Sequence, residues 1–98
     1  MAIIEVKGLI KNIMPYNKDK GKIVFTITEN AHIPSATGEM QPSATEYNIA
    51  VEANEEEMTK YQKALDKKGL LVITGELRVM FKNATIWILA KFENVYFV

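Results

Sequence analysis

The chain has 98 residues, of which 48% are hydrophobic and 24% are charged, so its composition fits one globular domain and excludes a disordered chain. It contains no cysteine, which excludes disulfides and thiolate metal sites. Twelve basic residues balance twelve acidic ones, and no stretch approaches the ~20 apolar residues of a membrane helix. We therefore expect a soluble, cytoplasmic single domain over residues 1–98.

The first predicted element is a strand. Residues 3–14 form an apolar-rich run with polar residues interspersed, and Pro15 ends it. Residues 16–22 contain turn-forming residues and predict a turn that carries three lysines, Lys18, Lys20 and Lys22.

Two further strands are expected on either side of a polar segment. Residues 23–28 are β-branched and aromatic and predict the second strand, while the alternation in residues 45–51 predicts the third. The segment between them, residues 29–44, is polar and predicts a long loop with Pro34, Gly38 and Pro42. Loops of this length in compact domains are often functional.

One helix is expected over residues 54–69, with Asn54 as its N-cap. Glutamates fill positions 55–57, where the helix dipole favours anions, so capping explains this acidic run better than an acidic-partner site does. Helical spacing places one apolar face toward the core, consisting of Met58, Tyr61 and Leu65.

Two strands follow the helix. Residues 70–80 predict the fourth strand, whose core face by the period of two is Leu71, Ile73, Gly75, Leu77 and Val79. Gly75 inside this strand predicts a sharp bend or a close backbone approach. After a short turn at 81–84, residues 85–92 predict the fifth strand, extended by residues 95–98.

The predicted order is three strands, one helix and two strands. This order is typical of the OB-fold, a five-stranded Greek-key barrel with one helix between the third and fourth strands. A generic α+β sandwich is the competing assignment.

Several motifs resemble those of the bacterial single-stranded DNA-binding proteins. Ala-Thr-Gly-Glu-Met at 36–40 and Thr-Glu-Tyr at 45–47 are similar to that family's loop and third strand, where Thr-Glu-Trp is usual. The run from Lys-Gly to Gly-Glu-Leu-Arg at 68–78 resembles its fourth strand, and residues 24–28 fit its second strand. The resemblance covers about residues 4–97.

The chain also departs from the family pattern. The family's loop aromatic would fall near His32 or Ile33, and its aromatic at the end of the third strand near Ala53. The sequence ends at Val98, and we expect no counterpart of the family's acidic, Phe-ending tail. A divergent version from a phage, plasmid or other mobile element would account for these differences.

The resemblance implies sequence-tolerant binding and protection of single-stranded DNA in replication or recombination, by a homodimer or homotetramer. Such binding needs a cationic groove and aromatic rings on which bases stack. The loops that flank an OB-fold ligand face then supply the candidate residues, with others from the strands: Tyr16, Lys18, Lys20, Lys22, Tyr47, Arg78, Phe81, Lys82 and Trp87.

The aromatic candidates each have a structural alternative. Tyr47 could stack on a base or pack in the core or a dimer, and Tyr16 could stack or close the turn after Pro15. Strand parity places Phe81 on the core side unless the turn redirects it. Trp87 alternates with Ile86 and Ile88, so it is expected to face away from the core, toward a ligand or a subunit.

We expect no enzyme activity, cofactor or metal site, because the sequence has no phosphate-binding glycine loop, nucleophile–base pair or metal-ligand spacing. The zero net charge supports an alternative function, an OB-fold interaction subunit of a replication or conjugation complex with weak or no DNA affinity. A cold-shock-like RNA binder is disfavoured, because the closely spaced aromatics of that class are absent from the predicted second and third strands.

Overall fold

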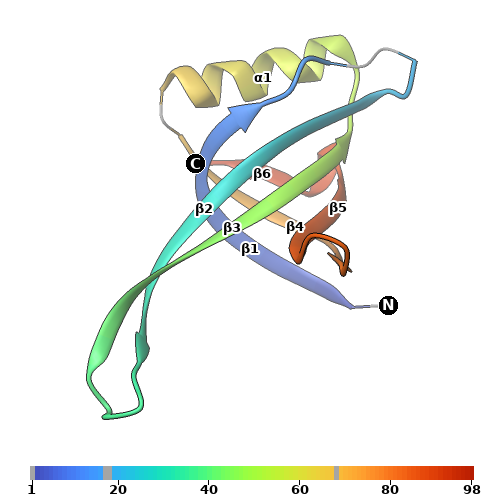
Figure 1. Ribbon diagram of the computed structural model, residues 1–98. Coiled ribbons are helices and arrows are strands. Elements are labelled where there is room, and N and C mark those ends of the chain that lie inside the picture. Colours follow the sequence, from blue (N-terminus) through green and yellow to red (C-terminus); the bar gives the residue numbers. More distant parts are fainter. Residues whose placement is uncertain (1, 17–18, 68) are drawn as a thin grey trace.

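The computed structural model describes residues 2–16, 19–67 and 69–98, and these form a barrel with one helix at its end (Figure 1). The described part of the chain has no helix that is long and apolar enough to cross a membrane. The elements in chain order are β1 (Ile3–Ile13), β2 (Lys22–Pro34), β3 (Met40–Glu52), α1 (Glu55–Asp66), β4 (Leu70–Met80), β5 (Thr85–Lys91), a 3-10 turn η1 (Phe92–Asn94) and β6 (Val95–Phe97).

The five long strands close into a barrel. They are hydrogen-bonded in the order β1-β2-β3-β5-β4, and β4 pairs again with β1. The pair of β3 with β5 is parallel, and the other four neighbouring pairs are antiparallel. A closed five-stranded barrel with a helix between its third and fourth strands is the OB-fold, so the predicted fold is confirmed.

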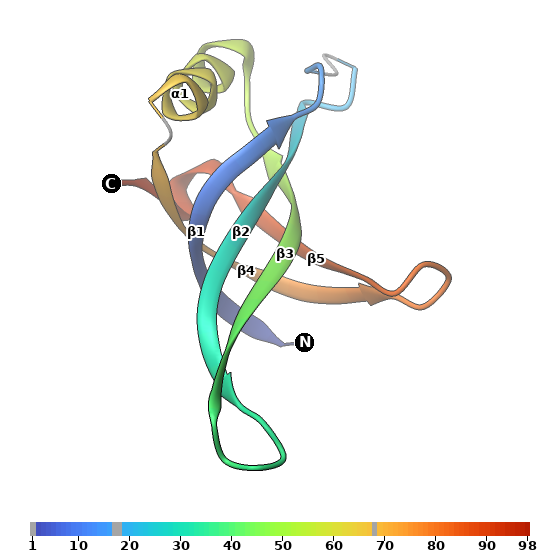
Figure 2. The same ribbon diagram turned by 60° about the vertical axis from the view of Figure 1, so that its left-hand side comes forward.

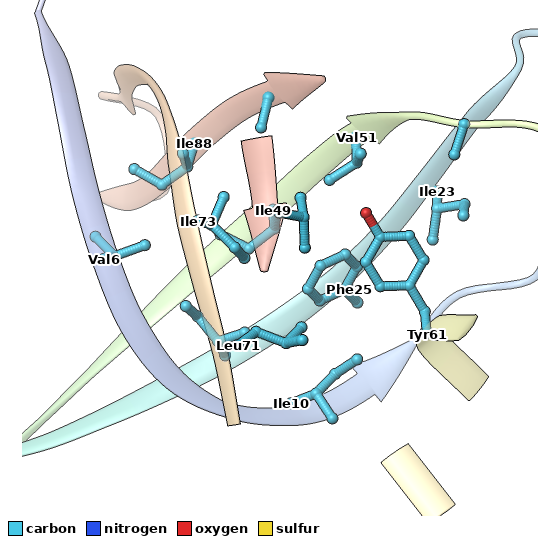
Figure 3. Close-up of a cluster of buried hydrophobic side chains, with 14 residues drawn as sticks. Val6, Ile10, Ile23, Phe25, Ile49, Val51, Tyr61, Leu71, Ile73 and Ile88 are labelled. Atoms are coloured by element: carbon cyan, nitrogen blue, oxygen red, sulfur yellow. The ribbon is translucent and has the colours of Figure 1, made fainter. Parts of the chain in front are cut away.

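The core fills the barrel with alternate residues from every long strand, as the period of two requires. Figure 3 shows Ile23 and Phe25 of β2 beside their register partners Val51 and Ile49 of β3, all pointing into this interior. Tyr61 enters the same cluster from α1, and its ring centroid lies 4.9 Å from that of Phe25. The helix therefore closes one end of the barrel with an aromatic side chain.

The start of α1 is set by a reciprocal cap. The Glu57 N–H donates to Asn54 Oδ1 at 2.8 Å, and the Asn54 N–H donates to Glu57 Oε1 at 2.9 Å. The predicted N-cap is thus confirmed, and α1 ends at Asp66, short of the predicted residue 69. Position 68 of the predicted helix and the side chain of Leu65 lie outside what the structure describes.

The predicted loop at residues 29–44 was wrong. β2 and β3 stay paired without interruption from Lys22 with Glu52 to Pro34 with Met40, and the tip of this hairpin is a turn in which Gly38 has a φ of 87°. The loop was predicted partly from Pro34 and Pro42, which lie in the part of the hairpin that projects beyond the barrel. A two-stranded ribbon has free outer edges, where the missing N–H of proline is tolerated.

Two details of the last strands also differ from the prediction. Val79 is 50% exposed although its parity matches the core, because β4 and β5 extend beyond the barrel as a second hairpin. The expected extension of the fifth strand was wrong as well. After β5 the chain turns through η1, and β6 pairs with the other end of β4 at residues 71–73.

Gly75 permits the closure of the barrel. A Cβ at this position would lie 2.5 Å from the carbonyl oxygen of Leu89 on β5. At this point β4 changes partners, since Gly75 pairs with Ile4 of β1 while Glu76 also pairs with Leu89. The predicted close backbone approach is confirmed.

Candidate nucleic-acid interface

A row of five side chains crosses the outer face of the barrel. Register pairs join Arg78 of β4 to Trp87 of β5, Trp87 to Asn48 of β3, Asn48 to Thr26 of β2, and Thr26 to Asn12 of β1. Directly paired residues share one face of a sheet. We call these five residues the outer row.

Burial confirms that the outer row faces away from the core. Trp87, Asn48 and Thr26 are half-buried, whereas neighbours of opposite parity such as Ile88 and Ile49 are fully buried. Two members of the row contact each other, since Asn12 Nδ2 donates to Thr26 Oγ1 at 3.5 Å, and Asn48 Nδ2 donates to the carbonyl oxygen of Ile86 on β5 at 3.4 Å.

The outer row lies at the root of two projecting hairpins. Asn48 and Trp87 are the first register pair between β3 and β5, so before this pair each strand runs in its own hairpin. Figure 2 shows the β2–β3 and β4–β5 hairpins leaving the barrel in different directions. A ligand on the outer row could therefore contact both hairpins.

Cations at the outer row are paired with carboxylates. The Arg78 guanidinium forms an ion pair with Glu76 of the same strand. Lys11, at the bulge of β1, reaches Glu46 of β3, with 3.4 Å between Nζ and Oε2. In both pairs the side chain of the cation is largely exposed, so a phosphate can reach the cation and compete with the carboxylate for it.

The tip of the β4–β5 hairpin is apolar and exposed. Phe81 is 94% exposed, so the turn at 81–84 redirects it away from the core, which was the stated alternative to core packing. Met80 beside it is also exposed, and Lys82 adds a charge. Ala84 closes this turn with a φ of 53°, in the left-handed region.

Tyr47 and Tyr16 occupy positions different from the outer row. Tyr47 pairs with Ile27 and packs partly against the core, on the inner side of β3. Burial, and secondly the charge of Glu29, raise the pKa of Tyr47 above its usual value. Tyr16 also packs against the core and donates its hydroxyl to the Ala53 carbonyl at 2.7 Å, a contact that closes the turn after β1.

The predicted loop lysines do not join the outer row. Lys18 lies outside the described residues, and Lys20 is exposed in the turn before β2. Lys22 pairs with Glu52 at the end of β3 that leads into α1. Of the predicted site residues, the structure brings together Arg78 and Trp87 on the barrel, with Phe81 and Lys82 at the hairpin tip.

Sequence reasoning missed the polar members of the site, Asn12, Thr26 and Asn48, together with Lys11. The alternation of residues 45–51 already separated Asn48 from the core face. Which residues of different strands meet depends on the register, and here a bulge between Ile10 and Asn12 shifts it. No local pattern in the sequence marks that bulge.

The outer row, together with Lys11 at the β1 bulge, combines three chemistries. Trp87 offers an aromatic face, Asn48 and Thr26 offer short polar groups, and Arg78 and Lys11 offer positive charge. An aromatic platform flanked by cations is what single-stranded nucleic acids require, because bases stack on the ring while phosphates contact the charges. The fold is an OB-fold, and the outer row lies on the outside of its barrel.

Solved structures with this fold include single-stranded DNA-binding proteins. A Plasmodium falciparum SSB in complex with ssDNA superposes with a TM-score of 0.65 at 15% identity, over 100% of this chain and 95% of that one. A small single-stranded DNA-binding protein from Mycoplasma pneumoniae superposes with a TM-score of 0.59 at 18% identity, over 98% of this chain and 92% of that one. The resemblance inferred from sequence is confirmed at the level of the fold.

No protein-family model matches the sequence, and no curated protein is significantly similar to it.

Proposed function

We propose that this protein binds single-stranded DNA with little sequence preference, by stacking bases on Trp87 and holding phosphates with Arg78 and Lys11. The single observation that carries the proposal is the outer row, in which an aromatic ring and a cation are direct cross-strand neighbours. The similar folds of two single-stranded DNA-binding proteins support it.

The geometry favours a single strand over a duplex. Bases in a duplex stack on each other, so their faces are not available to a protein ring. The exposed Phe81 and Lys82 at the β4–β5 tip extend the path of the strand beyond the barrel. Binding by these parts needs no catalytic group, and we place none in the site.

The test is a titration of a fluorescent oligo-dT and of a matched duplex, each over a series of salt concentrations. We expect the single strand to bind more tightly, with an affinity that falls as salt rises. Trp87→Ala should weaken binding about 5- to 150-fold, because stacking on a protein ring contributes ~1–3 kcal/mol per base.

Tyr96→Ala is the matched control, since Tyr96 is a 60% exposed aromatic on β6, away from the outer row. It should leave the affinity unchanged. No binding even at low salt would overturn the proposal and favour the protein-interaction subunit instead. Equal losses in both variants would also contradict a site at Trp87.

A role in replication or recombination, assembly into a homodimer or homotetramer, a cytoplasmic location and origin in a mobile element stay predictions. The role and the assembly follow from the resemblance of the sequence motifs to the single-stranded DNA-binding proteins, the location from the composition, and the origin from the departures from the family pattern.

A further inference from the structure

The indole of Trp87 is tied into a short chain of hydrogen bonds along β5. Its Nε1–H donates to Thr85 Oγ1 at 3.1 Å. The Thr85 hydroxyl in turn donates to Asn83 Oδ1 at 2.7 Å. The chain thus runs from the ring on the barrel into the turn at the hairpin tip.

Each link of this chain follows from local geometry. Thr85 and Trp87 are two residues apart on one strand, so their side chains share the outer face. Asn83 lies in the turn, and the residue between Asn83 and Thr85 is Ala84, where the backbone adopts a left-handed conformation. A hydroxyl is the group that can serve both neighbours, because it accepts from the indole and donates to the amide oxygen.

The chain has two consequences for the ring. An indole has one N–H donor, and here the Thr85 hydroxyl oxygen accepts its hydrogen bond. The hydrogen bond also restrains rotation of the Trp87 side chain about its χ angles. Less conformational entropy of the ring is therefore lost when a ligand binds.

We propose that Thr85 and Asn83 are positioning residues that hold the Trp87 ring ready for stacking and occupy its N–H. This inference rests on the proposed function and deepens it. A ring that presents its face and no free donor stacks on any base, which gives a physical reason for sequence tolerance at this position.

The test uses the fact that Trp87 is the only tryptophan in the chain, so intrinsic fluorescence reports on this ring alone. In the free protein, Thr85→Val should speed the sub-nanosecond depolarisation of the indole emission, because valine keeps the shape of threonine but cannot accept the hydrogen bond. Thr85→Ser should restore the wild-type decay. Valine also suits a strand, so the variant should fold.

The same variants are then titrated with oligo-dT. Loss of one neutral hydrogen bond that pre-orders the ring should weaken binding about five-fold in Thr85→Val, and Thr85→Ser should bind as the wild type does. Asn83→Ala should give a smaller effect of the same sign in both measurements.

The two readouts separate the inference from the proposed function. If the wild type does not bind oligo-dT, the proposed function fails, while the depolarisation measurement still decides whether Thr85 holds the ring. A depolarisation in Thr85→Val identical to that of the wild type would overturn the inference. Faster depolarisation in Thr85→Val with an unchanged affinity for oligo-dT would also overturn it, because positioning of the ring would then have no effect on binding.

Discussion

Arg78 illustrates how single residues set the strength of the proposed interface. Arg78 is the direct cross-strand neighbour of Trp87, and its guanidinium already forms an ion pair with Glu76, so a phosphate must displace this carboxylate. Lys11 is held by Glu46 in the same way. Local pairing of this kind agrees with the zero net charge of the chain and predicts moderate affinity.

Glu76→Gln should therefore raise the affinity for oligo-dT. Exposed ion pairs contribute up to about 1 kcal/mol, which corresponds to an increase of up to about five-fold, and the salt dependence should become steeper as Arg78 is freed. Glu56→Gln on α1 removes the same charge away from the outer row and serves as the control in the same titrations. Equal effects of the two variants would show that total charge, and not release of Arg78, governs binding.

Tyr61 makes a residue-scale contribution of another kind. Its side chain is fully buried, and in the described part of the chain its hydroxyl has no hydrogen-bond partner. Burial, and secondly the charge of Glu57, raise the pKa of Tyr61 above its ordinary value of 10.0. The unfolded chain therefore loses this proton at a lower pH than the folded protein does.

The stabilisation linked to Tyr61 is fully present below pH ~10 and falls as the pH rises above it. We expect Tyr61→Phe to flatten this alkaline loss and, at neutral pH, to raise the free energy of unfolding by about 1 kcal/mol, because an unpaired buried hydroxyl is removed. Urea unfolding at pH 7 and at alkaline pH checks both effects. If the free energy of unfolding of the variant falls as steeply with alkaline pH as that of the wild type, groups other than Tyr61 cause the loss.

At the scale of elements, the β4–β5 hairpin carries local strain at its turn. Ala84 adopts a left-handed conformation that disfavours any residue with a Cβ. Strain of this kind often lies at functional sites. Here it coincides with the turn that joins Asn83 to Thr85.

Ala84→Gly should raise the free energy of unfolding by about 1 kcal/mol, since glycine adopts this conformation without steric cost. For a domain of this size the melting temperature should rise by roughly 4–8 °C. Thermal unfolding followed by circular dichroism measures the change, with Ala36→Gly in the other hairpin turn as a comparison whose φ is not left-handed. A lower melting temperature for Ala84→Gly would contradict the strain.

The elements also show what could be predicted from the sequence. Runs of β-branched residues, the helix with its cap at Asn54 and the inward parity of Ile73 are local properties, and each was predicted correctly. The outer part of the β2–β3 hairpin was predicted as a loop because two prolines and a glycine are usual in loops, and because its stability comes from cross-strand pairing. Residues 95–98 were predicted as extended, but the pairing of β6 with β4 instead of its continuing β5 depends on a contact with an earlier strand that no local pattern shows.

The candidate site was predictable only in part for the same reason. The alternation along the fifth strand alone predicted that Trp87 faces away from the core, and the structure confirms this. The other four members of the outer row come from four other strands, and closure of the barrel brings them together. Polar residues such as Asn48 and Thr26 have no distinctive signal until that closure is known.

At the scale of the whole molecule, two hairpins diverge from a closed barrel (Figure 2). The outer row lies where they separate, so Trp87 is on the barrel and the exposed Phe81 is at the tip of a hairpin. This arrangement suits a flexible strand that follows the surface from the barrel to a hairpin tip. It does not offer stacking to bases that remain paired in a duplex.

The most direct test of this account is the fluorescence of Trp87 during titration with oligo-dT. A base stacked on the ring should quench the emission, and the quenching should saturate at the same DNA concentration as binding measured on a labelled oligonucleotide. A matched duplex should leave the emission unchanged. Tight binding of oligo-dT with no change in the emission of Trp87 would contradict the account, because the strand would then bind elsewhere on the protein.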